Sequence, residues 1–556
     1  MTVPALNARA RGWLRFLWRK ATTPDDWSEA GEPHPWWDRY SSEPVLNFAR
    51  FDLSESAYAV GIMADRTPAW REVYGRILDE LVRRHTTYWA AIDWLTQIGP
   101  DPRRNAYPDE WIATYLPKHL VGRYDVPGWT ANGVAPWGLQ PDPIGADGNL
   151  FFKGWLNLVM TLSGYVSGRD LRHDRFDVAG VGGTRFEWTQ ARLADWLVEL
   201  WQRHPAGPHC ENTKVWPFCL NAAGLGLSLY DTMFASDRHQ AWQRWSTETR
   251  GDYFGVEDGR LKWVALYWDP IVRHKQTVGP SGGFANALYL LPQDPAFAEL
   301  LYHGAVARMG WNDPRAPIQP TPDPRFLALG RILARELGDD RTDRRLGDYA
   351  EQHFEPRFFG RADSEFGWWF RLGEPWPRGQ LSAIMMMAEV GGVGAWTRLF
   401  RQPNLTKFAE PTVEGVDFPS LGVSSAWNDP ATGLLHVETY PADGEADRPT
   451  TFRVTGLGDL DRVRVRCDGQ EHQRWHRLGP GAIAIETDLA THRFEIAVDR
   501  RSPDRPSRSG TERMATPVAG GQAAVRSAGR GVVEPRSVTM AAGAMELGGL
   551  GCPCCR

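Results

Sequence analysis

The sequence predicts a mainly helical protein, a bundle or an α/α toroid, followed by a small C-terminal β-sandwich. Apolar residues recur at spacings of three and four through most of residues 46–425, which is the periodicity of helices that bury one face. Paired helical segments alternate there with loops and have no strands of their own, as in bundles and toroids. Over residues 426–500 apolar and polar residues alternate between turn residues, which indicates short β-strands.

Four regions follow from these patterns. Residues 1–45 are predicted to be an N-terminal extension rich in Pro, Trp and charge, and residues 46–425 the helical domain. Residues 426–500 are the predicted β-sandwich. Residues 501–556 are rich in Arg, Ser, Gly, Pro and Ala without periodicity, so we expect a disordered tail.

The N-terminal stretch ARARGWLRFLWRK is basic and amphipathic. We expect its cations to form a solvated helix face, and weak contact with an anionic surface is the alternative. These cations are Arg9, Arg11, Arg15, Arg19 and Lys20.

Composition limits the function classes. The 556 residues carry a net charge of -5, which weighs against nucleic acid as a partner. No run approaches the roughly 20 apolar residues of a membrane span, and no secretory signal is visible. Only Cys210, Cys219 and Cys467 lie in foldable sequence, which is no disulfide framework, so we expect a reducing, cytoplasmic location. The 27 Trp could fill a core or line an apolar pocket.

The segment HCENTKVWPFCLN, residues 209–221, carries the most chemical information. Cys210 and Cys219 lie nine positions apart around a loop, and Cys219 opens an apolar helix, where the helix dipole favours a thiolate. Two thiols facing one another across a pocket could act as acid and base. Spacing alone favours two buried structural cysteines or a loop disulfide.

This segment resembles the linalool dehydratase-isomerase family, whose two cysteines have the same spacing. Further residues fit the same family segment: Glu211, Trp216, Phe218 and Asn221. Upstream, FDLSESAY places Asp52 and Tyr58 six apart, as the family spaces an active-site Asp and Tyr on its first helix. A loop-to-helix transition near Asp52 would let both side chains point inward.

Three further stretches continue the resemblance over about residues 45–400. NLFFKGWLNLVM is similar to the family's Asn…Ser-Gly-His-Leu segment, and ALYWDP and GPSGGFANAL look like its Tyr-Asp strip and Gly-rich helix start. Trp155 stands where the family has His, and an indole offers only an N–H donor. His209 could partly compensate. The departure puts linalool itself in doubt as the substrate.

The resemblance implies an (α/α)6 toroid with a deep apolar pocket, and a dehydration or isomerisation of an allylic terpenoid or prenyl alcohol without metal or organic cofactor. Asp52, Tyr58 and Cys210 would act at the hydroxyl, and Cys219 would act near the carbon as base or transient nucleophile. A homo-oligomer is compatible with the sequence. The expected isoprenoid-binding residues are Phe151, Trp155, His209, Glu211, Trp216, Phe218, Tyr267 and Phe284.

Two other function classes stay open. A toroid also suits glycoside hydrolases and polysaccharide lyases, with Asp363, Glu365 or Glu374 amid WWF and EPWP as acid and base. A non-catalytic scaffold or binding protein is the third hypothesis. The DDRTD stretch at 339–343 matches the metal motif of terpene synthases, but Gly338 and the surrounding charges favour a solvated loop and helix cap.

Overall fold

The computed structural model describes most of the chain up to residue 497. The described ranges are 4–38, 49–91, 142–210, 214–270, 273–321, 323–441 and 447–497, with four short strands between 97 and 139. All of them belong to one compact unit. The predicted disordered tail at 501–556 lies outside the described residues, as does Glu211.

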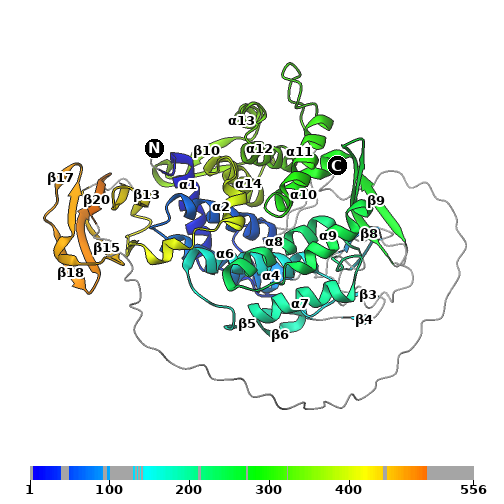
Figure 1. The fold of residues 1–556 in the computed structure, drawn as a ribbon, viewed down its shortest axis with the longest axis horizontal. Helices are drawn as coiled ribbons and strands as arrows, with labels where there is room; N and C mark the ends of the chain where they lie inside the picture. Colours follow the sequence, from blue (N-terminus) through cyan, green and yellow to red (C-terminus); the bar gives the residue numbers. More distant parts are fainter. Residues whose placement is uncertain are drawn as a thin grey trace, which may run out of the picture. The chain divides into compact units, whose positions relative to one another are not determined.

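Helices dominate the described residues up to about 410 (Figure 1). In chain order they are α1 Ala8–Thr22, α2 Ala49–Arg66, α3 Glu72–His85, α4 Tyr88–Ala91, α6 Leu150–Ser167, α7 Gln190–Arg203, α8 Pro217–Phe234, α9 Gln240–Tyr253, α10 Gly283–Leu290, α11 Pro295–Arg308, α12 Pro324–Leu337, α13 Asp340–His353, α14 Gly379–Val390 and α15 Ala395–Arg401. The predicted helical part is thereby confirmed as mainly helical.

Two sets of helices differ in how they are buried. Helices α2, α6, α8, α10, α12 and α14 contact one another in this order, and α14 contacts α2 again. Helices α2, α6 and α14 are buried almost all round, which explains their continuous apolar and small residues. Helices α3, α7, α9, α11 and α13 each pack on one of the first set and keep a polar, exposed face.

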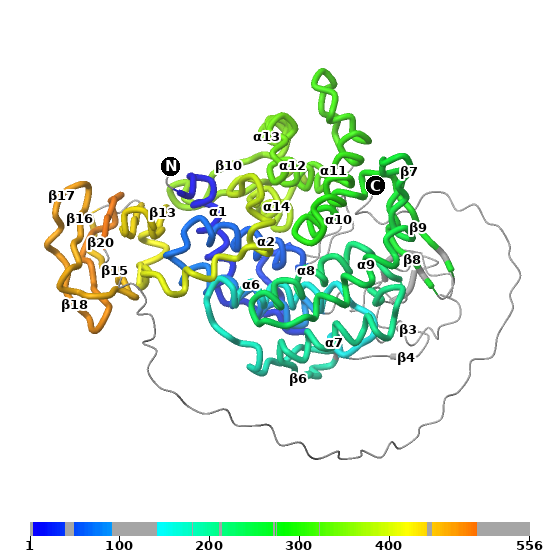
Figure 2. Tube along the Cα trace, in the orientation of Figure 1, coloured from blue at the N-terminus to red at the C-terminus, as the bar shows by residue number. Residues whose placement is uncertain are grey.

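Helices α6 and α8 pack closely because small residues line their contact (Figure 2). A Cβ atom added to Gly154 would lie 2.7 Å from the Cβ of Ala223, a separation that real side chains do not reach. Gly226 of α8 likewise faces Leu158 of α6. The close approach fixes the two helices whose first turns flank the cysteine loop.

The N-terminal segment is part of the core, so the predicted solvated face of α1 is wrong in part. Lys20 is 2% exposed, and its Nζ donates to Asp52 Oδ2 at 2.7 Å. Arg19 pairs with the buried Glu365. An amphipathic pattern does not distinguish a solvated cation from one that pairs with a carboxylate on a neighbouring helix.

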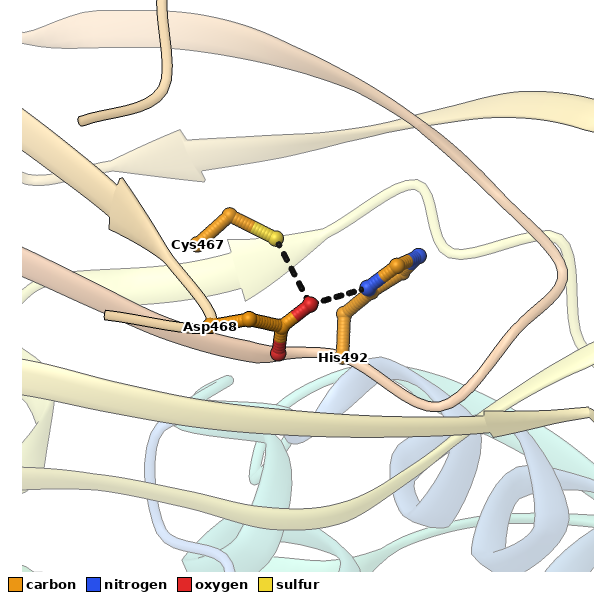
Figure 3. A group of neighbouring side chains, drawn as sticks. All are labelled: Cys467, Asp468 and His492. Atoms are coloured by element: carbon orange, nitrogen blue, oxygen red, sulfur yellow. Dashed lines mark hydrogen bonds and ion pairs between the residues drawn. The ribbon is translucent and has the colours of Figure 1, made fainter. Parts of the chain in front are cut away.

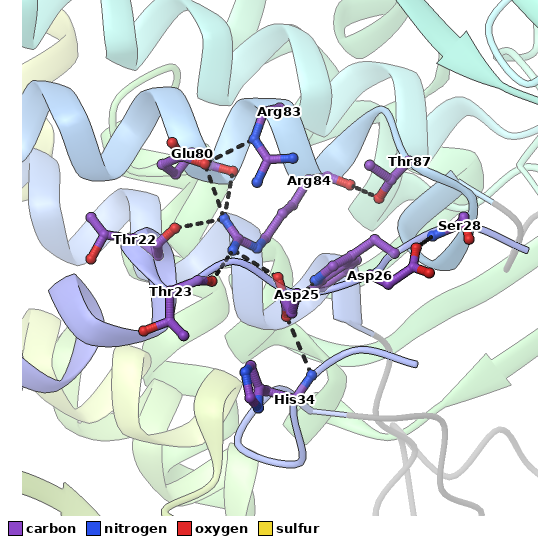
Figure 4. A network of polar contacts seen from close by, with 12 residues as sticks. Thr22, Thr23, Asp25, Asp26, Ser28, His34, Glu80, Arg83, Arg84 and Thr87 are labelled. Atoms are coloured by element: carbon purple, nitrogen blue, oxygen red, sulfur yellow. Dashed lines mark hydrogen bonds and ion pairs between the residues drawn. The ribbon is translucent and has the colours of Figure 1, made fainter. Parts of the chain in front are cut away.

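Arg84 of α3 anchors the chain that follows α1 (Figure 4). Its guanidinium is fully buried and donates to the backbone oxygens of Ala21 at 2.7 Å and Thr23 at 3.1 Å. It also pairs with Asp25 at 2.9 Å and Glu80 at 3.3 Å. The 1–45 segment is therefore not a loose extension over its described residues.

Short antiparallel strands interrupt the helices, although the sequence pattern predicted none before residue 426. They are β5 Arg175–Ala179 with β6 Arg185–Thr189, then β7 Phe254–Glu257, β8 Arg260–Asp269 and β9 His274–Val278, then β10 Pro356–Phe359 with β11 Glu365–Trp368. The described short pairs near residue 100 are β1 Gln97–Pro100 with β2 Trp129–Ala131, and β3 Val134–Ala135 with β4 Gly138–Leu139. Apart from β8, which has ten residues, strands this short give little alternation to recognise.

Two antiparallel sheets follow the helices. One has the order β12-β15-β19-β18, the other β13-β14-β20-β16-β17. They pack face to face through Phe452 and Phe494, whose ring centroids are 5.2 Å apart, as in a β-sandwich. The bounds are β12 Thr412–Glu414, β13 Leu421–Asp429, β14 Leu434–Pro441, β15 Pro449–Thr455, β16 Arg464–Cys467, β17 Gln470–Glu471, β18 Trp475–Gly479, β19 Ala482–Asp488 and β20 Arg493–Ala497.

The helix cap predicted for the DDRTD stretch is confirmed, whereas the predicted solvated loop is wrong, because Asp340 to Asp343 lie in α13. Asp339 caps α13 by accepting from Thr342 N at 3.1 Å, and Asp343 pairs with Arg335 at 2.7 Å, so the DDRTD stretch is a helix start.

Candidate active site

The two cysteines of the 209–221 segment meet in the protein interior. Cys210 Sγ donates to Cys219 Sγ across 3.2 Å, and both residues are buried and free of a disulfide. The distance is well above that of a sulfur–sulfur bond and suits a thiol facing a thiolate. The sequence prediction that the thiols could face one another is therefore matched by their geometry.

Helix starts hold both thiols. Cys219 lies in the first turn of α8, after Pro217 at the first helical position. On the other side, the carbonyls of His209 and Cys210 accept from Leu150 N at 3.2 Å and Asn149 N at 2.6 Å, at the start of α6. The positive ends of two helix dipoles thus lie close to the pair, which favours negative charge on sulfur.

Lys153 adds a buried cation near this pair. It is fully buried, one turn into α6, and its Nζ donates to the carbonyl of Ala146. Burial lowers the pKa of Lys153 to about 7, and negative charge on Asp142, Asp147 and Cys210 opposes that shift. The family segment has Ser at this position, so the sequence comparison offered no signal for an ammonium group here.

A cluster of aromatic rings surrounds Trp155. Its ring lies edge-on to Phe51 at 4.9 Å, Phe151 at 5.3 Å and Phe218 at 5.5 Å, and it stacks with Tyr289 at 6.4 Å. The Trp155 indole N–H has no hydrogen-bond partner among the described residues. Trp155 therefore contributes apolar surface where the family has a polar imidazole.

An apolar cavity opens beside this cluster. The rings of Phe51, Trp216, Phe218 and Tyr289 form part of its wall, together with aliphatic residues of β8, α10 and α12. Neither cysteine lines the cavity. Cys219 follows Phe218 directly. Burial raises the pKa of Tyr289 well above its ordinary value, and the nearby Cys219 adds a smaller contribution in the same direction.

Glu55 is the titratable group of this cavity that sequence reasoning missed. It is 3% exposed, its Oε1 accepts from Gln380 Nε2 at 3.4 Å, and its Oε2 has no partner among the described residues. Burial raises the pKa of Glu55 to about 8, so the carboxyl is protonated at neutral pH. The sequence feature that could have identified Glu55 is its position three residues before Tyr58, which puts both on the same face of α2.

Tyr58 lies beside Tyr289 rather than beside Asp52. The Tyr58 and Tyr289 rings are edge to face at 6.1 Å, and Trp396 packs on Tyr58 at 5.3 Å. Burial, and then the charge of Glu55, raises the pKa of Tyr58 well above its ordinary value. The phenol is thus a neutral donor close to the cavity.

Asp52 points to another surface of α2. Its carboxylate accepts from Lys20 Nζ, Ser56 Oγ and the backbone N of Asp38 at 2.7, 3.2 and 3.2 Å. A helix does begin near Asp52, but Asp52 already lies in the first turn of α2. In a continuous helix, positions six apart differ by about 120° in direction, so Asp52 and Tyr58 cannot share one face.

The remaining predicted binding residues differ in where they lie relative to the cavity. Tyr267 packs behind Trp216, with ring centroids 5.2 Å apart, and Val215 pairs with Trp268 to hold this part of the loop against β8. His209 packs on His204, 4.5 Å between rings. Phe284 is fully buried against Trp311 at 5.3 Å and does not line the cavity.

The carboxylates proposed for a glycoside hydrolase do not converge on this cavity. Glu365 is bound by Arg19, and Glu374 by Arg378 at 2.8 Å. Asp363 is exposed beside a shallow hollow lined by Arg11 and Arg15. None of these carboxylates lines the apolar cavity.

A comparison with protein families matches residues 134–362 to linalool dehydratase/isomerase. The matched stretch includes both cysteines, Trp155, Tyr267 and α10, and the match indicates an enzyme of dehydratase or isomerase type. It does not extend to α2, which carries Glu55 and Tyr58.

Other comparisons add little. No curated protein matches the chain. An endoglucanase CelQ from Clostridium thermocellum, complexed with cellotriose, is similar at 11% identity over 89% of this chain and 92% of its own, with a TM-score of 0.21. A GH127 β-L-arabinofuranosidase from Geobacillus stearothermophilus T6 is similar at 10% identity over 87% of this chain and 75% of its own, with a TM-score of 0.24. TM-scores of this size establish neither a shared fold nor a shared activity.

None of the helices in the described ranges combines the length and apolarity needed to cross a membrane. Three metal-ligating side chains lie within reach of one another in the C-terminal sheets, at Cys467, Asp468 and His492. They are not part of the apolar cavity.

Proposed function

We propose that the protein is a cofactor-free lyase or isomerase that acts on an allylic terpenoid or prenyl alcohol. The observation that carries the proposal is a buried carboxyl in an apolar, aromatic-walled cavity, close to a pair of thiols 3.2 Å apart. Loss of a hydroxyl from an allylic carbon requires a proton donor at the oxygen and a base at a neighbouring carbon. Glu55 and the thiol pair supply these two groups.

In the proposed reaction, Glu55 gives its proton to the hydroxyl of the substrate, and the carbon–oxygen bond breaks to release water. Cys219, as thiolate, then takes a proton from the carbon next to the allylic cation, and a new double bond forms. Cys210 donates to the Cys219 sulfur and stabilises its negative charge. Proton return from the Cys219 thiol to Glu55 restores the enzyme. For isomerisation, water adds at the other end of the allylic cation, and the Glu55 carboxylate takes the proton that this water loses.

The walls of the cavity support a cationic intermediate. The faces of aromatic rings attract positive charge, and an apolar wall excludes competing water. Phe51, Trp216 and Phe218 line the cavity, and Trp155 packs against two of them. A small hydrophobic isoprenoid fits this surface. In this proposal Asp52 stabilises the fold through Lys20 and does not touch the substrate.

We also propose that the described helices form an (α/α)6 toroid, with the C-terminal sheets as a β-sandwich. The cyclic order of contacts from α2 through α6, α8, α10, α12 and α14 back to α2 supports this arrangement. The cavity walls come from α2, β8, α10, α12 and α14, near the start of α8, as expected for a site within such a ring.

The test is an assay of the full-length enzyme with allylic prenyl alcohols of five, ten and fifteen carbons, under reducing conditions, with products separated by gas chromatography. We expect dehydration or isomerisation by the wild type. Cys219→Ala and Glu55→Gln should each lower kcat by about 10²- to 10⁴-fold, the usual contribution of a positioned acid or base.

Glu336→Gln is the matched control. Glu336 is also 3% exposed with a raised pKa, but its carboxylate accepts from the backbone N of Trp396 at the start of α15, outside the cavity. This variant should keep its activity as long as it folds. Equal turnover by wild type and Cys219→Ala would exclude the thiol mechanism. Turnover of model glycosides that depends on Asp363 or Glu365 would favour the hydrolase hypothesis instead.

A further inference from the structure

Three different metal-ligating side chains meet at one end of the five-stranded C-terminal sheet (Figure 3). The Cys467 sulfur, an Asp468 carboxylate oxygen and a His492 ring nitrogen all lie within 4.8 Å of one another. Cys467 is the last residue of β16, Asp468 begins the turn to β17, and His492 immediately precedes β20. Thiolate, imidazole and carboxylate are the donors that Zn²⁺ uses in proteins.

The backbone fixes Asp468 in this place. Asp468 and Gly469 have φ values of 50° and 80°, the positive values of a tight two-residue hairpin turn. Asp468 N donates to the Arg493 carbonyl at 2.8 Å, and Arg493 N donates to Asp468 Oδ1 at 2.9 Å. Oδ1 is thereby occupied, and Oδ2 is directed at Cys467 and His492.

A second carboxylate orients the imidazole. His492 Nδ1 lies 2.7 Å from Asp468 Oδ2, and His492 Nε2 lies 2.9 Å from Asp488 Oδ1. A histidine that binds a metal through one ring nitrogen commonly donates its other N–H to a carboxylate, which sets the tautomer. In this structure Nδ1 donates to Asp468 Oδ2. A bound metal ion would replace that proton, and the N–H of Nε2 would stay on Asp488.

We propose that Cys467, Asp468 and His492 bind a divalent transition-metal ion of the Zn²⁺ class, with Asp488 as a positioning residue for His492. In a tetrahedral site with ordinary bond lengths, neighbouring ligand atoms lie about 3.3 to 3.6 Å apart. The Cys467 sulfur already lies 3.6 Å from Asp468 Oδ2. The nitrogen–oxygen pair at 2.7 Å has to separate by less than about 1 Å, and the sulfur and the ring nitrogen lie within 4.8 Å of one another.

The proposed ion joins a turn within the five-stranded sheet to the loop that connects the two C-terminal sheets. Cys467 and Asp468 belong to the β16–β17 turn, and His492 belongs to the loop between β19 and β20. Three protein ligands leave a fourth position of the tetrahedron for water or another small ligand. The site therefore stabilises the C-terminal sheets and is independent of the chemistry proposed for the helical cavity.

Co²⁺ is the probe, because a thiolate–Co²⁺ bond gives an ultraviolet charge-transfer band that carboxylate and imidazole do not give. The full chain is titrated with Cys552, Cys554 and Cys555 replaced by Ser, so that terminal thiols cannot contribute. We expect one equivalent of bound Co²⁺ with this band, and displacement by Zn²⁺. Cys467→Ser should abolish the band, and Cys219→Ala, which removes a thiol of the helical cavity, should leave it unchanged.

Two further variants separate ligand from positioning roles. Asp488→Asn should weaken Co²⁺ binding by about 10- to 100-fold while the band persists. His492→Gln should weaken it more, and His476→Gln, on the exposed strand β18, should have no effect. Circular dichroism checks that each variant is folded. A band that survives Cys467→Ser, or a folded parent chain that binds neither Co²⁺ nor Zn²⁺, overturns the proposal.

Discussion

Replacing Lys20 by Met tests whether Asp52 is a structural anion. The Lys20 and Asp52 side chains are 3% and 0% exposed, with 2.7 Å between Nζ and Oδ2. Methionine keeps the unbranched stem of the side chain and removes its charge. The carboxylate that remains has Ser56 Oγ and the Asp38 backbone N as neutral donors, and neither compensates its charge.

Breaking a buried pair at one partner costs about 3–5 kcal/mol, because an uncompensated charge stays in the interior. The cost depends on pH. Burial raises the pKa of Asp52, and the charge of Lys20 opposes the rise. Without Lys20 the folded-state pKa rises further, so the variant loses stability as pH increases above the ordinary aspartate value of 3.8. Below that value Asp52 is protonated in both states, and the cost is smallest.

Urea unfolding followed by circular dichroism at pH 4 and pH 7 measures this difference. Arg9→Met is the matched control, since the Arg9 and Glu351 side chains are 30% and 42% exposed and such a pair contributes about 0–1 kcal/mol. Adding Asp52→Asn to Lys20→Met should recover much of the loss at pH 7. If Lys20→Met costs no more than Arg9→Met at pH 7, Lys20 does not neutralise Asp52, and its carboxylate becomes available for catalysis.

Three further predictions test packing and charge. The free energy of unfolding of the wild type should fall by up to about 5 kcal/mol as pH rises from 4.5 to about 8, because folded Glu55 keeps its proton over that range. In urea titrations, Glu55→Gln should remove this part of the pH dependence. Gly154→Ala should destabilise the protein by about 1–3 kcal/mol, because the new Cβ contacts Ala223. The control Gly251→Ala has open space around it in α9 and should stabilise the protein slightly. Unchanged melting temperatures for both variants would contradict the close α6–α8 packing. Arg84→Met should cost about 3–5 kcal/mol and expose the N-terminal segment to limited proteolysis, and resistance equal to the wild type would refute its anchoring role.

Periodicity was enough to predict the long elements. Helices α6, α8, α11 and α12 and strands β14, β15 and β19 lie where spacings of three and four, or of two, indicated them. Most strands within the helical part were missed because five residues or fewer offer too few alternations; β8, with ten residues, was missed although it is long. The first strand of the C-terminal sheets begins at Thr412, before the predicted boundary at 426. This strand, β12, was missed because it has only three residues.

The candidate site was predictable where neighbours in sequence are neighbours in space. Cys210 and Cys219 belong to one loop and one helix start, so their spacing limited how far apart the sulfurs could lie. Asp52 was a different case. Its orientation depends on Lys20, which is more than 30 positions away and belongs to a helix that the pattern assigned to an extension. The residues near Asp52 in the sequence do not indicate that Lys20 is its partner.

Trp155 explains why Glu55 is the carboxyl to test. In the family a histidine at this position can bind a hydroxyl, whereas here an indole packs between Phe51 and Phe218 and provides no acid. The charged residues that line the cavity are Glu55 and Arg325, and Arg325 is held by Asp323 through paired hydrogen bonds. A proton for the leaving hydroxyl must then come from α2 rather than α6. In the proposed mechanism the thiol pair is retained, the hydroxyl-binding group moves to the opposite wall, and the substrate has to present its oxygen toward Glu55.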